Sequence, residues 1–148
     1  MTKQLTRLSA GLLALAFSLP LAAENSTTVG GYTIHHNAIT TDSLPPEIAQ
    51  HYGFTRSPNR GMVTITVMEN RATGQPQAVP AQVAVTATNL TGQTRDIGVH
   101  EVKEQHAIYY IGDFPVSNEE TLNFTLKVKP EGSSQTYTAE FSQQFFTR

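Results

Sequence analysis

Short runs of alternating apolar and polar residues recur along this 148-residue chain and constrain its fold more than any other feature. In the run Met62–Met68, branched apolar residues occupy every second position, and the same period recurs at 81–88, 122–128 and 137–145. When the period is two residues, successive side chains lie on opposite faces of a β-strand. These runs therefore predict strands with one buried face. The positions expected inside are Val63, Ile65, Val67, Val83, Val85, Leu122, Phe124, Leu126 and Phe141.

Turn-forming residues separate these runs at regular intervals. With weaker strand patterns at 32–39, 97–99 and 107–111, the sequence predicts about seven strands, spaced as in an antiparallel sandwich. No long amphipathic helix interrupts the series, which argues against an α/β fold. We therefore predict an all-β, immunoglobulin-like antiparallel sandwich with one short helix, formed by residues 24–148 as a single domain. An antiparallel sheet closed on itself is the alternative.

The first 23 residues have the pattern of a cleavable signal peptide. Lys3 and Arg7 precede an apolar run at 10–21, and small residues precede Glu24. The apolar run is shorter than the roughly 20 residues that cross a bilayer comfortably. We therefore expect a periplasmic protein without a transmembrane segment after signal removal.

Charge and composition exclude several classes of function. The chain has 10 basic and 12 acidic residues, and two of the basic ones, Lys3 and Arg7, lie in the predicted signal peptide. The mature domain then carries eight basic against 12 acidic residues, a net charge of −4. An acidic domain without a basic cluster is a poor partner for nucleic acid. The absence of cysteine excludes disulfides, thiolate metal sites and cysteine nucleophiles.

The segment Tyr32–Arg60 departs from the regular strand pattern. Pro46 suits the first turn of a helix and Gly53 suits its C-terminal end, so we predict a helix at 46–52. Ile48 and Tyr52 are expected to pack inward. The small polar residues at 24–31 before this segment are expected to form a flexible lead-in.

We predict that this irregular segment is the binding surface, because loops on a rigid sheet often carry binding residues. Aromatic residues and arginine are the types that most often anchor an interface. The alternative for the arginines is a structural role, in which they pair with Asp42 or Glu47 and hold the loop. The candidate ligand-binding residues are His35, Tyr52, Phe54, Arg56 and Arg60.

The His35-His36 pair raises the possibility of a metal site. Consecutive strand residues point to opposite faces, so one ion cannot bind both side chains without a backbone kink. We predict that His36 packs in the core and that neither a metal nor another cofactor is required. A copper or zinc carrier that uses His35 with Met62 or Met68 is the first alternative. A hydrolase with an unrecognised site is the second, since no nucleophile with a base beside it is recognisable.

Three stretches of the sequence resemble one family of exported proteins. They are HHNAITTDSLPPEIAQHYGFTRSPNRGMVTITV, AIYYIGDFPV and FSQQFF, and their most specific parts are Asn37-Ala38, the run from Leu44 to Gly53, and Arg56-Ser57. The chain resembles domain-of-unknown-function family 4426, whose members tend to carry His-Tyr where this chain has His35-His36. The resemblance implies a periplasmic β-sandwich from a Gram-negative bacterium and implies no activity.

Together these observations predict a periplasmic binding or protein-interaction module rather than an enzyme. Its ligand is either a small molecule or a periplasmic protein.

Overall fold

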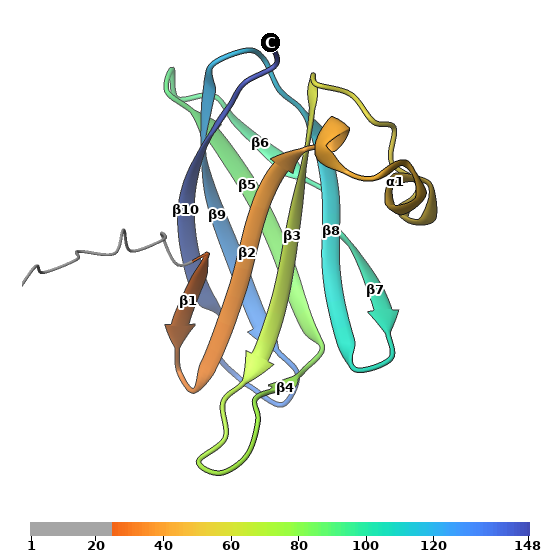
Figure 1. Cartoon of the computed structure of the whole chain (residues 1–148). Coiled ribbons are helices and arrows are strands. Elements are labelled where there is room, and N and C mark those ends of the chain that lie inside the picture. The colour runs from red at the N-terminus through yellow and green to blue at the C-terminus, as the bar shows by residue number, and fades with distance from the viewer. Residues whose placement is uncertain (1–24) are drawn as a thin grey trace, which may run out of the picture.

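The computed structural model describes residues 25–148, so the predicted signal peptide lies outside the described residues. Two antiparallel sheets pack face to face, and one short helix lies outside them (Figure 1). In sheet A the strand order is β1 (Ser26–Val29), β2 (Tyr32–Thr40), β3 (Arg60–Glu69), β8 (Ala107–Pro115) and β7 (His100–Glu104), with β4 (Gln77–Ala78) also beside β3. In sheet B it is β10 (Tyr137–Phe145), β9 (Glu120–Pro130), β5 (Ala81–Asn89) and β6 (Thr94–Ile97).

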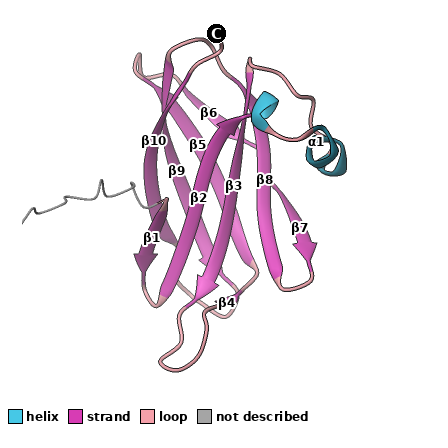
Figure 2. Cartoon of the chain, in the orientation of Figure 1, coloured by secondary structure: helices cyan, strands magenta, loops and turns pink. Residues whose placement is uncertain are grey.

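The predicted all-β sandwich is confirmed (Figure 2). The chain crosses between the sheets three times, after β4, after β6 and after β8. Each crossing brings strands that are distant in sequence into one sheet, and β3 pairs with β8 in this way.

The core lies between the inner faces of the two sheets, as the alternating pattern predicts. Seven of the nine predicted positions are buried, and the other two, Val83 and Phe141, are partly buried and pack against the core. Phe124 makes edge contacts with Phe114 and Phe145 at centroid distances of 5.5 and 6.4 Å. These rings come from β8, β9 and β10, so they join the two sheets.

Two local predictions are wrong. Residues 26–29 form strand β1, which pairs with β2 through a hairpin at Gly30-Gly31, rather than a flexible lead-in. Both glycines have positive φ, so they make the tight turn that starts this ladder. On the helix, Ile48 is 40% exposed, and Ala49 is the buried residue. A helix of only two turns has a narrow contact face, and here its smallest side chain occupies that face.

Helix α1 (Pro46–Tyr52) follows the short 3₁₀ helix η1 (Thr41–Ser43). Gly53 ends α1 in the left-handed conformation with φ 74°, as the sequence predicts. The buried Thr41 hydroxyl donates to the Thr55 carbonyl at 2.8 Å and accepts from the Ser57 N–H at 2.9 Å. Because one buried hydroxyl holds both ends of this irregular segment together, α1 has a defined position on the sheet.

A close approach at Gly112 positions β7 relative to β8. Gly112 lies on the inner face of β8, where a Cβ would overlap the carbonyl oxygen of Gly98 in the β6–β7 crossing. Only glycine lets the crossing backbone lie so close to the strand. The crossing then delivers β7 to the edge of sheet A beside β8.

Candidate functional site

Helix α1 covers part of the outer face of sheet A. Beneath it lies a small second core of Leu44, Ala49, Met62 and Ile111, surrounded by partly buried apolar side chains that include Phe54. These residues come from the helix segment and from β3 and β8. Packing of this kind is what holds a seven-residue helix, because so short a helix is marginal alone.

Beside this covered area lies the α1 cleft, which we define by the residues that line it. Its cavity measures about 730 Å³ and opens between the C-terminal end of α1 and the β7–β8 hairpin. Val102 and Tyr109 face each other across the β7–β8 ladder and supply apolar surface. The lining residues are His51, Val102, Lys103, Glu104, Gln105, His106, Ala107 and Tyr109.

Glu104 joins the helix to the edge strand in this cleft. Its Oε1 lies 3.1 Å from the Tyr52 hydroxyl and 3.1 Å from His51 Nε2. A carboxylate only accepts hydrogen bonds, so both groups donate, and His51 therefore carries its proton on Nε2. Burial raises the pKa of the Tyr52 phenol, and the bond to Glu104 raises it further. The cleft therefore combines apolar surface with a carboxylate and an imidazole that are in contact.

The rim of the cleft carries a strained turn. Gln105 has φ 45°, in a region that non-glycine residues rarely adopt. It is followed by His106, and the two residues connect Glu104 to Ala107, which face each other in the ladder. Strained residues of this kind collect at functional sites. The sequence-based predictions did not include Glu104 or His106, because Gln105-His106 lacks the Asn-Gly or Asp-Gly pair that signals a two-residue hairpin.

The structure separates the predicted site residues into two groups. Tyr52 and Phe54 lie by the helix, where the Phe54 ring is 6.2 Å from that of His100. His35 is exposed on the outer face of β2 and lines a smaller hollow of about 360 Å³ together with Asn37 and other polar residues.

The two predicted arginines are bound to the protein itself. Arg56 donates from Nε to the Leu44 carbonyl at 2.8 Å and from Nη2 to the Asp42 carbonyl at 2.9 Å. Arg60 donates to one carboxylate oxygen of Asp113, from Nε at 2.8 Å and from Nη2 at 2.6 Å. These contacts fit the structural alternative, with the Asp42 backbone and Asp113 as partners.

The arrangement gives limited support to metal or catalytic chemistry. His35 is opposite Thr66 in the ladder, whereas Met62 is 7% exposed beneath α1 and Met68 is opposite Thr33. Within residues 25–148, no group of three or more histidine and carboxylate side chains is arranged to hold a metal ion. The His51–Glu104 pair resembles an acid–base pair, but no hydroxyl nucleophile is hydrogen-bonded to His51 in the described part of the chain.

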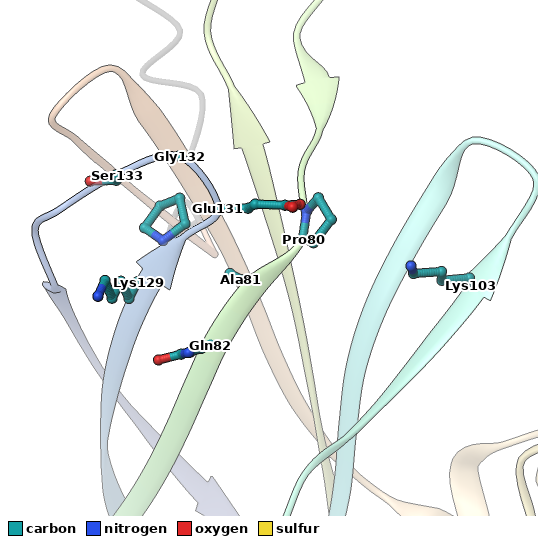
Figure 3. A pocket seen from close by; sticks show the side chains of 9 residues that line it. Pro80, Ala81, Gln82, Lys103, Lys129, Glu131, Gly132 and Ser133 are labelled. Carbon is teal, nitrogen blue, oxygen red and sulfur yellow. The ribbon is translucent and has the colours of Figure 1, made fainter.

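A second cavity of about 420 Å³ lies between the start of β5 and the end of β9. Lys103 and Lys129 lie on opposite sides of its opening, with Glu131 and Pro80 between them (Figure 3). Lys103 also lies 3.4 Å from the Glu101 carboxylate. Since these carboxylates offset the two lysines, the cavity lacks the concentrated charge that an anion site needs.

Known structures share this fold. A DUF4426 family protein from Pseudomonas aeruginosa is 33% identical, with 82% of this chain and 93% of that chain covered and a TM-score of 0.68. FetP from uropathogenic Escherichia coli, expressed in the periplasm, is 10% identical, with a TM-score of 0.60 over 82% of this chain and 92% of its own. A copper-bound FetP variant, also 10% identical, has a TM-score of 0.61 over 83% and 95%. At this identity the FetP likeness shows the fold alone.

No curated protein matches the chain in sequence. Among the described residues, no helix is long and apolar enough to cross a membrane. The family model for a domain of unknown function, DUF4426, matches residues 26–148. The match covers nearly all of the described residues, and the P. aeruginosa relative carries the same domain. The chain therefore belongs to the DUF4426 family.

Proposed function

We propose that this protein is a periplasmic binding module and that the α1 cleft is its ligand site. The observation that carries the proposal is the combination of about 730 Å³ of open volume with convergent polar groups, Glu104, His51 and His106, over apolar surface. Ligand sites characteristically combine an apolar wall with a few placed polar groups. The edge position of β7 also leaves the cleft accessible from one side of the sheet.

Two observations support a periplasmic location. The first 23 residues have the pattern of a signal peptide, and FetP, which has the same fold, was expressed in the periplasm.

The residues predicted from the sequence have different parts in this proposal. Tyr52 and Phe54 support the cleft from the helix side, and Tyr52 orients the Glu104 carboxylate. Arg56 and Arg60 hold the loop that carries α1, and so act on the site indirectly. His35 provides a separate polar contact on the same face of sheet A.

The proposal is tested by capture from periplasmic extract on the immobilised mature protein. The double variant Glu104→Gln with His106→Ala removes the charge and one imidazole, while the glutamine amide oxygen still accepts from Tyr52. We expect the captured ligand to bind at least about tenfold more weakly, which corresponds to roughly 1.4 kcal/mol. The melting temperature should stay within a few degrees of the wild-type value.

Thr86→Ala, on the outer face of sheet B, is the matched control and should capture as well as the wild type. Equal capture by the cleft variant and this control would place the binding surface elsewhere.

Metal transport is a second candidate, favoured by the copper-bound FetP variant. Imidazole is a good copper and zinc ligand, and the cleft holds His51 and His106. Elemental analysis of protein purified from a copper-supplemented periplasm separates the two functions. About one copper or zinc ion per chain supports transport, whereas metal-free protein contradicts it.

A further inference from the structure

His36 occupies an unusual place for an ionisable side chain. It is 5% exposed on the inner face of β2, where β1, β2 and β10 meet. Its ring stacks on Phe141 of β10, with centroids 4.4 Å apart and planes at 10°, and Phe141 stacks in turn on Phe124 at 4.6 Å. On the other side, His36 Nε2 lies 3.4 Å from the Thr27 hydroxyl of β1. We call this contact between Thr27, His36 and Phe141 the seam.

The environment favours the neutral imidazole. Nδ1 is inaccessible to solvent and has no hydrogen-bond partner within the described residues. In the neutral ring, the Nδ1 lone pair accepts no hydrogen bond. Protonation would instead place a positively charged N–H group at the same apolar position. A buried charge without an acceptor is among the costliest groups in a protein interior.

Among the described residues, no side chain near the ring carries a negative charge that would offset the charge of protonated His36. His35 precedes His36 along the chain and Glu140 precedes Phe141, and both side chains point to the outer faces of their sheets. The described part of β1 has no charged side chain, and the residue opposite His36 on β3 is Ile65. Burial lowers the pKa of His36, the positive charge of His35 lowers it further, and a backbone hydrogen bond of His36 raises it by a smaller amount. A cation also gains from contact with an aromatic face, but that attraction is smaller than the cost of desolvation.

We propose that His36 makes the seam an acid-sensitive joint, which loosens when the medium around the exported domain turns acidic. A protonated ring needs contact with water, and the strands beside it, β1 and β10, are the edge strands of the two sheets. Strand β1 has four residues and lies at the edge of sheet A, so it is the element most easily released. This inference does not depend on the α1 cleft.

The direction of the pH effect follows from the lowered pKa. In the unfolded chain His36 binds a proton with an ordinary pKa of about 6.5, whereas in the folded protein the ring binds it less readily. The contribution of His36 to stability is therefore complete above about pH 6.5 and decreases as the pH falls through the window below that value. At pH 5 the population of the open seam can rise by up to about thirtyfold relative to neutral pH.

Amide hydrogen exchange at pH 7.5 and pH 5, corrected for the intrinsic exchange rates, tests whether the seam opens in acid. We expect the His36 N–H, which donates to the Asn25 carbonyl at 2.8 Å, and the β1 amides to lose about tenfold or more in protection at pH 5. His36→Phe keeps an aromatic ring on Phe141 without a titrating group, so this loss should disappear. His100→Gln, an exposed histidine on β7 at the opposite edge of sheet A, is the control and should behave as the wild type does.

An equal loss of protection in His36→Phe and wild type would overturn the proposal, as would a loss spread evenly over both sheets. The wild-type protein alone supplies a second readout if the phenylalanine variant fails to fold. An NMR titration in which His36 protonates at or above the ordinary histidine pKa, with the seam amides still protected, would also overturn it.

Discussion

Phe124→Ala is expected to lower the free energy of unfolding by roughly 3–5 kcal/mol. Phe124 is 1% exposed and contacts Phe114, Phe141 and Phe145, so it lies where aromatic rings of both sheets meet. Truncation removes the apolar contact area and leaves a cavity that three surrounding rings cannot fill without shifting. Urea or guanidinium unfolding, followed by circular dichroism, measures the loss directly.

Asn123→Ala is the matched control for this variant. Asn123 precedes Phe124 on β9 but faces solvent, so its truncation should change stability by no more than about 0.5 kcal/mol. A loss below about 1 kcal/mol for Phe124→Ala would mean that the aromatic cluster is not the centre of the core.

The double variant Arg56→Ala with Arg60→Ala is expected to lower stability by about 1–3 kcal/mol in total. Arg56 loses two bonds to carbonyl groups of the preceding segment, and because this side chain is exposed, each contributes less than the roughly 1.5–3 kcal/mol of a charged donor shielded from water. Arg60 loses its ion pair with Asp113, but both side chains are about one-third exposed, so solvent screening keeps that contribution near 1 kcal/mol or less. Thermal and denaturant unfolding measure the sum.

Arg71→Ala, in the exposed connection between β3 and β4, is the control and should leave stability nearly unchanged. The double variant distinguishes the two roles that the sequence left open for these arginines. If it melts like the wild type and loses captured ligand, the guanidinium groups contact the ligand. A lower melting point supports their role in holding the loop.

The sequence was informative where a property depends on neighbouring residues. His35 and His36 show this, because adjacent strand residues must face opposite ways, and the structure places one outside and the other in the core. The end of α1 at Gly53 is equally local, since it depends on one residue that adopts positive φ readily. Ile48 shows the limit, because the face that a two-turn helix presents is set by the surface beneath it.

The α1 cleft could not be predicted in this way. Its central contacts join Glu104 to His51 and Tyr52, which lie 53 and 52 positions earlier in the chain. The partner of Arg60 is likewise 53 positions away, so Asp42 and Glu47 were the wrong side chains to consider for it. No local pattern encodes which distant side chain a flexible polar group will meet.

The sequence by itself determined the all-β class, the buried face of the main strands and the family, because each depends on period, composition or residue identity along the chain. Only the tertiary structure decided which strands became neighbours, which residues line the cleft and that His36 closes a seam between β1 and β10. The physical reason is that pairing β3 with β8, or packing β2 against β10, depends on the free energy of the whole sandwich. That free energy depends on contacts between residues far apart in the sequence, so the pattern of a single segment does not predict which strands pair.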